Sequence, residues 1–347
     1  MPRPRHYLLG LLGGLALLGA GVYLAHDGRP QPPPEPKAVA GLAWLPAQAG
    51  LVAGLDLAEM RQQVWLLEMI RRATGEVRES PDYQAFVEAT GFDYARDLDH
   101  VWVGVFGPSE QPVVVGVAEG RFARAKILAY ARTQGSARHR YQGIEIYQVQ
   151  TGVQNPRPRE SGSAKSNQSG RSFAFAFLDN THLAFASDSE RAAMIVDCWL
   201  GKAPAVGSDE GRRAAVEQLA AGRQAWVVDE LAKWQPPVFQ KQEALQALVV
   251  QLSLGLRVSG AGVEVETEAR CREPGQAERL RDNLRVLVLA ARLALGRQRD
   301  ESSQALGEAL GNLALSQQGD TLQARVTLPP ETLAALLGVP PAAPSGS

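Results

Sequence analysis

The acidic segment 91–105, which reads GFDYARDLDHVWVGV, gathers several side chains that could do chemistry. Asp93, Asp97 and Asp99 are followed by His100, just before an alternating apolar stretch that predicts a strand. Carboxylate oxygens can hold a cation, and a carboxylate beside an imidazole can serve as an acid/base pair. The spacing matches no calcium-binding loop. We therefore favour a capped turn that leads into an edge strand over a metal or catalytic site.

Histidine and cysteine positions add no metal-binding or nucleophile motif. The histidines are His6, His26, His100, His139 and His182. No two of them have a ligand-like spacing such as i and i+4 on a helix, so no zinc signature is present. Cys198 falls in a predicted helix and Cys271 at a predicted strand end. A disulfide between them is an alternative in an oxidising compartment, but two separate thiols are the favoured interpretation.

Motifs of the common enzyme classes are also missing. The sequence contains no G-x-S-x-G elbow, S-x-x-K pair, phosphate-binding loop or dinucleotide fingerprint. We therefore name no catalytic, cofactor-binding or metal-binding residue, and we expect no cofactor. A non-enzymatic protein is favoured, although an enzyme stays open because catalytic groups can come from distant parts of a chain. The net charge of −1 provides no basic field for a polyanion, so nucleic acid is not an expected partner.

The N-terminal stretch Tyr7–Ala25, YLLGLLGGLALLGAGVYLA, carries no charged residue. A helix of this length rises about 28 Å, close to the hydrocarbon thickness of roughly 30 Å. Tyr23 stands where cleavage after Ala25 would need a small residue, so an uncleaved signal-anchor is favoured over a cleaved signal peptide or a buried helix. Arg3 and Arg5 precede the span and predict an inside N-terminus. We expect a single-pass protein of a bacterial cytoplasmic membrane whose bulk is extracytoplasmic, in the periplasm.

Segment 26–40 follows the span and holds five prolines in HDGRPQPPPEPKAVA, which predicts an extended, stiff stalk. Within the span, small residues share one helical stripe, the pattern by which membrane helices associate with each other. These residues are Gly10, Gly14, Gly21 and Ala25. Chance patterning is the favoured alternative to transmembrane self-association, because glycine is common in membrane helices.

From residue 41 onward one unit recurs, in which two alternating strands and a tight turn are followed by a helix. In the copy that starts FAFAFLDN, Phe173, Phe175 and Phe177 share one strand face. In the copy that starts LRVSGAG, valines alternate with Glu264, Glu266 and Glu268, which are expected to face water. The next helix is expected to bury an apolar face. That face contains Leu280, Leu284, Leu287 and Ala291.

Two short apolar strands that end in Asp56 and Asp229 precede these units, and each is expected to lead into a helix. We therefore predict two similar halves, 41–203 and 204–338, with an internal duplication. Unrelated halves are the alternative, because hairpin-helix units are common. The predicted fold class is α+β, a mainly antiparallel sheet with helices on one face. A polar loop over 151–171 and the tail 339–347 are predicted to be disordered.

The runs WLPAQAGLVAGLDLA and GFDYARDLDHVWVGV, together with the later hairpins, resemble a group of uncharacterised bacterial membrane-anchored proteins. In that group an N-terminal span precedes an extracytoplasmic α+β domain. The resemblance covers most of residues 41–338 and implies the same architecture. It brings no activity, ligand or site residue.

Our leading hypothesis is a membrane-tethered, non-enzymatic binding or structural module whose partner is an unknown protein or envelope component. The first alternative is a carrier of an apolar or lipid ligand, in a sheet–helix cavity lined by Phe173, Phe175 and Phe177. Those phenylalanines also suit a plain core. The second alternative is a hydrolase with an unrecognised site.

Overall fold

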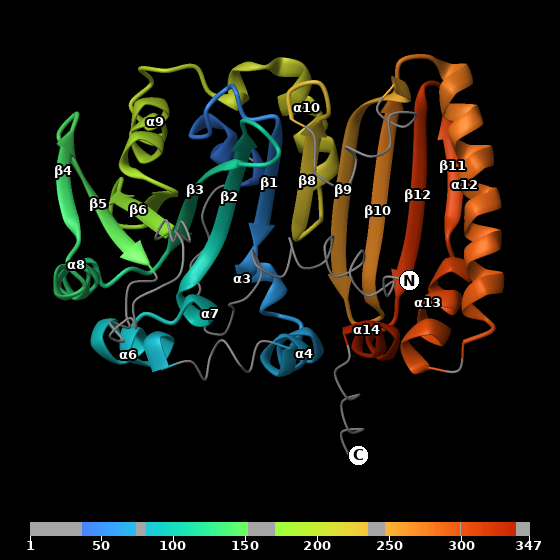
Figure 1. Cartoon of the computed structure of the whole chain (residues 1–347), viewed down its shortest axis with the longest axis horizontal. Helices are drawn as coiled ribbons and strands as arrows, with labels where there is room; N and C mark the ends of the chain where they lie inside the picture. Colours follow the sequence, from blue (N-terminus) through green and yellow to red (C-terminus); the bar gives the residue numbers. More distant parts are fainter. Residues whose placement is uncertain (1–36, 74–80, 152–170, 235–246, 299, 338–347) are drawn as a thin grey trace, which may run out of the picture.

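A computed structural model describes residues 37–73, 81–151, 171–234, 247–298 and 300–337, which form one large antiparallel sheet with helices packed on it (Figure 1). The strands of the first half are β1 (Leu51–Asp56), β2 (Leu98–Phe106), β3 (Val113–Gly120), β4 (Ala137–Tyr141), β5 (Ile144–Thr151), β6 (Arg171–Phe177) and β7 (His182–Ala186). Its helices are α2 (Lys37–Ala40), α3 (Leu57–Met60), α4 (Val64–Ala73), α6 (Pro81–Thr90), α7 (Tyr94–Asp97), α8 (Arg124–Thr133) and α9 (Ser189–Trp199).

The second half contains fewer strands and longer helices. Its strands are β8 (Ala225–Glu230), β9 (Val249–Ser259), β10 (Gly262–Cys271), β11 (Ala314–Gln318) and β12 (Thr321–Leu328). Its helices are α10 (Glu210–Ala220), α12 (Pro274–Leu295), α13 (Glu301–Gly311) and α14 (Pro330–Leu337). The predicted α+β class with a mainly antiparallel sheet is confirmed.

Hairpin-helix units form at β2–β3–α8, β6–β7–α9, β9–β10–α12 and β11–β12–α14, and local chemistry explains their turns and helix starts. Asp188 caps α9 by accepting a hydrogen bond from the N–H of Arg191 at 3.0 Å. Gly319 has a φ of 59° in the turn between β11 and β12, a conformation that favours glycine. Asp56 ends β1 and caps α3, as the sequence predicts. After Asp229, however, residues 231–233 form a turn and not the predicted helix.

The two halves meet at the centre of the sheet, whose strand order is β11-β12-β10-β9-β8-β1-β2-β3-β7-β6-β5-β4. Outward from the β1–β8 pair, the first half reads β1-β2-β3-β7-β6 and the second reads β8-β9-β10-β12-β11. Gly54 lies opposite Trp226, and a Cβ atom at Gly54 would sit 2.4 Å from the indole ring. Only glycine lets the two central strands pack in this register.

Helices cover both faces of the sheet in the first half, so the prediction of helices on one face is wrong there. On one face, α9 and α10 pack over a cluster that includes Val52, Trp102 and Trp226. On the opposite face, Leu67 of α4 packs with Val101 and Val103, while α8 packs with the Phe175 side. The central strands are apolar at both alternating positions, and both faces must therefore be shielded from water.

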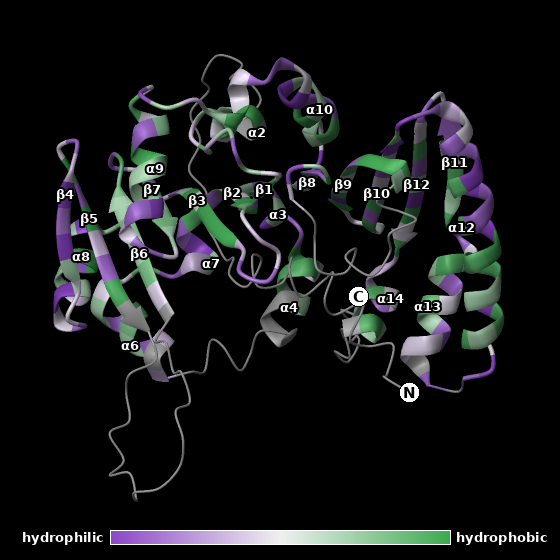
Figure 2. Ribbon diagram, turned by 45° about the horizontal axis from the view of Figure 1, so that its top comes forward, coloured by the Kyte–Doolittle hydropathy of each residue, from purple (hydrophilic) through white to green (hydrophobic). Residues whose placement is uncertain are grey.

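The second half is asymmetric: α12, α13 and α14 lie against one face of its strands (Figure 2), and the other face is polar. Clusters around Val263 and Ala269 pack against α12, α13, α14 and the end of α4. On the other face, Glu266 lies opposite Gly255 of β9, which lies opposite Trp226 of β8. The polar face therefore continues the sheet surface that α9 covers in the first half and that α10 covers over β8 and β9.

Helix α12 departs from its predicted packing. Its Leu280 is buried, whereas Leu287, which was predicted to be buried, is 62% exposed. The inner contacts of α12 come from its first half, where Ala277, Leu280 and Leu284 meet β10 and β12. Its second half passes the outer strand β11 and the end of α13, where Arg292 lies beside Gly311.

Several predictions fall outside the described residues. These are the span Tyr7–Ala25 with its glycine stripe, most of the stalk, the loop interior 152–170 and the tail 339–347. The last residues of the predicted stalk form α2, where Val39 is buried in the core. Among the described helices, none combines the length and the apolar character needed to cross a membrane.

Candidate functional site

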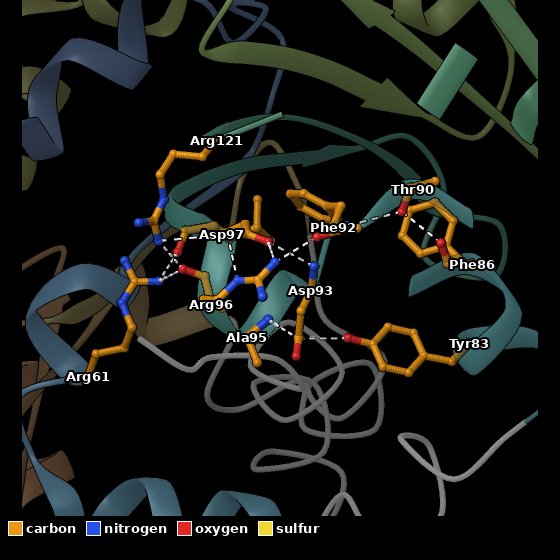
Figure 3. Close-up of polar contacts among 12 residues, drawn as sticks. Arg61, Tyr83, Phe86, Thr90, Phe92, Asp93, Ala95, Arg96, Asp97 and Arg121 are labelled. Carbon is orange, nitrogen blue, oxygen red and sulfur yellow. Dashed lines mark hydrogen bonds and ion pairs between the residues drawn. The ribbon is translucent and has the colours of Figure 1, made fainter. Parts of the chain in front are cut away.

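The acidic segment forms a network of structural contacts around α7 (Figure 3). Asp93 caps α7: its Oδ1 accepts hydrogen bonds from the Ala95 N–H at 2.9 Å and from the Tyr83 hydroxyl at 2.7 Å. In return, the Asp93 N–H donates to Asp97 Oδ2 at 2.9 Å. The predicted capped turn is confirmed.

Arginines neutralise the two other aspartates of this segment. Arg96 donates to both oxygens of Asp97, at 3.0 and 2.7 Å, and Arg121 lies 3.9 Å away. Burial alone would raise the pKa of Asp97, but the hydrogen bonds and charge of Arg96 lower it below its usual value. Arg61 pairs with Asp99 and donates to the Leu98 carbonyl at 2.6 Å. Within the described parts of the chain, no cluster of acidic, histidine or cysteine side chains is suited to hold a metal ion.

His100 belongs to a different arrangement, because β2 is a central strand and not the predicted edge strand. In the strand register, Asp56 of β1 lies opposite His100, His100 lies opposite Glu119 of β3, and Glu119 lies opposite His182 of β7. Paired residues of antiparallel strands share a face. Acid, base, acid and base therefore form one row across four strands.

The His100 imidazole sits between two carboxylates. Its Nε2 lies 3.1 Å from Asp56 Oδ2, and its Nδ1 lies 3.1 Å from Glu119 Oε2. Both contacts are ion pairs, because the ring N–H groups do not point directly at the carboxylate oxygens. The ring stacks on Trp102 with centroids 5.6 Å apart. Burial alone would lower the pKa of His100, but Asp56 and Glu119 raise it to about 9. At neutral pH the imidazole is therefore protonated, which makes it a poor general base.

His182 extends this row into an aromatic cluster. Its Nδ1 lies 2.9 Å from Asp179 Oδ2, and its ring contacts Trp44 and Trp199 at centroid distances of 4.8 and 5.3 Å. Trp44 also packs edge-on against Trp102 at 5.2 Å. The row and its tryptophans come from six segments of the chain, so no linear motif identifies them. The only sequence signal is a polar residue at an inward-facing strand position.

Asp229 ends the strand that corresponds to the Asp56 strand in the predicted duplication, but its carboxylate lies in a different electrostatic environment. Its carboxylate is buried, and neither oxygen accepts a hydrogen bond from any described residue. Burial raises its pKa to about 7, although the charge of Arg212 opposes this shift. The buried Arg212 guanidinium donates to the carbonyls of Ala49 and Gly50 and lies 3.2 Å from Glu230. Asp229 therefore carries a fractional charge near neutral pH.

The polar face of the second half contains a charge cluster and a cavity. Glu266 is buried between Arg223, which lies in direct contact, and Arg325 at 2.9 Å, so the prediction that Glu266 faces water is wrong. Beside it, the sheet and α10 border an open cavity of about 270 Å³. The lining residues are Ala215, Gln218, Gln251, Ser253, Glu268, Arg270, Gln318, Thr321 and Gln323. They come from α10 and four strands, which explains why sequence spacing missed them.

The remaining candidate residues are packed in the core. Phe175 and Phe177 are buried in an aromatic cluster, where Phe175 stacks on Tyr147 at 5.5 Å, and Phe173 at the strand start is 41% exposed. Their side chains therefore fill space that an apolar ligand would need. Cys198 and Cys271 are buried free thiols. Burial raises the pKa of Cys198 to about 11, which disfavours a nucleophilic thiolate.

Comparisons with known proteins identify a family and no activity. No curated protein matches the chain. Crystal forms I, III and IV of TP0453 are similar in structure at 12–13% sequence identity, with TM-scores of 0.44–0.46. These similarities cover 86% of this chain and 96–97% of the TP0453 chains, and at this level they carry no inference about function. The family model of DUF3352, a protein of unknown function, matches residues 8–336, and the chain therefore belongs to this family.

Proposed function

We propose that this chain is a non-enzymatic binding module that holds a hydroxyl-rich component of the cell envelope on the polar face of its second half. One observation carries this proposal: the sheet face that α9 and α10 cover over the central strands is polar and hollowed farther out, over β9 to β12. The charged groups of the first half are neutralised within the fold, as Glu266 is in the second half. Asp97 pairs with Arg96, and His100 pairs with Asp56 and Glu119.

The cavity lining favours a polar ligand of low net charge. Four glutamines, one serine and one threonine supply both donors and acceptors, while Glu268 and Arg270 contribute one charge of each sign. Polyhydroxylated molecules such as saccharides match this mixture, because each hydroxyl both donates and accepts. Within the fold, Gln251 donates to Ser253 and Gln323 donates to Glu268. An apolar ligand would leave the remaining donors and acceptors of the lining without partners, at a cost of about 1–3 kcal/mol for each group.

A binding experiment tests the ligand class. The probe is a β-1,4-linked N-acetylglucosamine tetramer, observed by saturation-transfer NMR with the full chain in detergent micelles. We expect saturation transfer from the protein, and an affinity at least five-fold weaker when Gln218 and Gln323 are both replaced by leucine. Gln134→Leu is the control, because this exposed glutamine lies beyond α8 in the first half. No transfer to this tetramer or to a glucan tetramer would contradict the proposal.

Tethering and location form a second part of the proposal. We infer an uncleaved single-pass anchor at Tyr7–Ala25 in a bacterial cytoplasmic membrane, with the folded part in the periplasm. The uncharged stretch after Arg3 and Arg5 supports this inference. Alkaline phosphatase fused after Ser347 should be active in cells, because that enzyme matures outside the cytoplasm. An inactive fusion of full abundance would place the C-terminus inside.

An internal duplication is the third part. The matching strand orders β1-β2-β3-β7-β6 and β8-β9-β10-β12-β11 support it, and the β4–β5 hairpin is then an addition to the first half. Rotation of one half by half a turn about the β1–β8 contact should superpose the five strand pairs in order. A superposition that matches strands out of sequence order would contradict the duplication.

A further inference from the structure

The outer edge of the first half is strongly basic. Segment 121–150, which contains α8, β4 and most of β5, has six lysine and arginine residues and one acidic residue, Glu145. Its net charge is +5, whereas the whole chain has a net charge of −1. Strand β4 ends the sheet, is exposed from Ala137 to Arg140 and is mostly hydrophilic (Figure 2).

Four arginine side chains of this segment gather around Glu145 and Tyr147. This arginine cluster consists of Arg124 and Arg132 of α8 and Arg138 and Arg140 of β4. Arg138 lies 3.3 Å from the Glu145 carboxylate, and Arg140 lies opposite Glu145 in the strand register. The two arginines of β4 therefore flank one carboxylate.

The arginines of α8 approach the same point from the helix. The Tyr147 hydroxyl donates to Glu145 at 2.5 Å, and this hydrogen bond lowers the pKa of Glu145. The charges of Arg138, Arg140 and Arg124 lower the same pKa further. The Arg124 guanidinium also lies over the Phe177 ring, 5.3 Å from its centroid. Burial and Glu145 raise the pKa of Tyr147, and the nearby Arg132 opposes that shift.

The single carboxylate does not neutralise the arginine cluster. Glu145 is ionised at neutral pH, and four guanidinium groups therefore keep an excess of three positive charges. No carboxylate of the described residues lies within 4.0 Å of the Arg132 or Arg140 guanidinium. All four arginines are exposed. A ligand in solution can therefore reach the unneutralised groups.

Protection of the sheet edge explains only part of this arrangement. Charged residues on an edge strand prevent sheets from joining, and Arg138 and Arg140 meet that need. Arg124 and Arg132, however, lie on α8, which packs on a face of the sheet against Tyr147. The β4–β5 hairpin beside them has no counterpart in the strand order of the second half. The convergence of charge therefore has a cause other than the shared sheet.

The surface around the arginine cluster offers little for an apolar partner. The core of a protein interface and an inserted lipid chain both need accessible apolar surface. Ile127, Tyr147 and Phe175 are buried beneath the cluster, and Phe173, which is 41% exposed, lies at the start of β6. The accessible groups are mainly guanidinium groups, which favours a small or extended anionic ligand.

We propose that the arginine cluster is a binding site for phosphate groups. A guanidinium group donates paired N–H groups to the oxygens of phosphate and carboxylate alike. The charge balance favours phosphate, because a phosphate monoester carries about −1.5 to −2 at neutral pH and a carboxylate carries a single charge. The ligand class is therefore a phosphate monoester or a diphosphate. This inference is independent of the saccharide cavity, which lies on the second half.

Calorimetric titration tests the site. Inorganic pyrophosphate is titrated into the full-length protein in nonionic detergent micelles at low salt, and we expect saturable binding. Replacement of both Arg132 and Arg140 by glutamine should weaken the affinity at least about ten-fold, because each arginine loses a charge-assisted hydrogen bond.

The matched control removes the same charge from another exposed surface. Arg279→Gln combined with Arg285→Gln on α12 should keep the pyrophosphate affinity within about two-fold of wild type, since distant charges are screened. No saturable binding by wild type, or equal weakening in the control, would overturn the proposal.

A variant with the opposite expected effect separates binding from loss of folding. Glu145→Gln removes the negative charge at the centre of the arginine cluster, while its amide oxygen can still accept from Tyr147. Pyrophosphate should bind at least about two-fold more tightly to this variant, which a damaged fold would not produce. Weaker binding than wild type would overturn the proposal.

Competition against bound pyrophosphate identifies the source of the phosphate. Stronger displacement by glucose 6-phosphate assigns a soluble or saccharide-borne ester, and stronger displacement by glycerophosphoglycerol assigns a lipid headgroup. Either result supports the site. Tricarballylate, a tricarboxylate, represents an acidic peptide. If it displaces pyrophosphate as well as the better phosphate ester does, or if neither ester displaces pyrophosphate, the assignment to phosphate is overturned.

Discussion

Both halves of the sheet bury one charge between two charges of opposite sign, but the polarity is reversed. In the first half, the cation His100 lies between Asp56 and Glu119. In the second half, the anion Glu266 lies between Arg223 and Arg325. Both groups lie on the same face of one sheet, and in both cases burial opposes the charge while the two partners favour it. The comparison shows that the strand register, rather than composition, creates these groups.

The two triads differ in how they respond to pH. Arginine stays protonated throughout the accessible range, and Arg223 and Arg325 lower the pKa of Glu266 against the opposing effect of burial. The Glu266 triad therefore keeps its charges from mildly acidic to alkaline pH. The His100 triad loses its central charge in alkaline solution, because the pKa of His100 is about 9.

The largest expected effect comes from breaking the Glu266 triad. Glu266→Ala leaves the nearly buried Arg223 guanidinium without its carboxylate, and we expect a loss of about 4 kcal/mol in the free energy of unfolding. Urea denaturation followed by circular dichroism measures this loss. Glu264→Ala, on the same strand with a partner at 3.8 Å, is the control and should cost less than ~1 kcal/mol. If Glu266→Ala and Glu264→Ala lost the same free energy of unfolding, Glu266 would contribute no more than a solvent-exposed ion pair.

An effect of intermediate size comes from titrating the first triad. The pKa of His100 is raised in the folded state, so its stabilisation is fully present below pH 6.5 and is lost as the pH rises through about 9. The full loss is about 3 kcal/mol, at ~1.4 kcal/mol for each pKa unit. Urea denaturation at pH 6, 8 and 10 should show this decline in wild type. His100→Leu should keep only the decline between pH 6 and pH 8 that Asp229 contributes, and should show none between pH 8 and pH 10. The decline in the free energy of unfolding should persist in Glu266→Ala. If it disappeared in that variant, the two triads would be energetically coupled.

The smallest of the three effects concerns Asp229, the buried acid with no described hydrogen-bond partner. Its pKa is raised to about 7, so its contribution to stability is present below pH 4 and is lost as the pH rises through 7. Asp229→Asn removes this loss. At pH 5.5, where the loss has reached about half of its full size, we expect the variant to be about 2 kcal/mol more stable than wild type. At pH 4 the two proteins should unfold at similar urea concentrations. A variant destabilised at both pH values would show that the carboxylate has a partner that asparagine cannot replace.

Much of the fold could be predicted from local patterns. The period-two alternation in FAFAF and VEVETEA predicts strands, and Asp188 and Pro330 mark helix starts. Each of these signals depends only on residues close together in the chain. The helix coverage could not be predicted so well, because a strand such as β2 is apolar at both alternating positions and gives no sign of which helix covers which face. Leu287 shows the same limit, since helical spacing groups apolar residues but does not say which group meets the sheet.

The sequence by itself determined the hairpin-helix units, the α+β class and the capped turn at Asp93, because each depends on contacts between residues close in the chain. Only the tertiary structure decided the rest of the candidate sites. It brought Asp56, His100 and Glu119 into one row, buried Glu266 between two arginines, and placed α10 beside the polar cavity. The physical reason is that strand order and register set which distant side chains become neighbours, and those neighbours determine whether a buried charge is neutralised, shifted in pKa or left for a ligand.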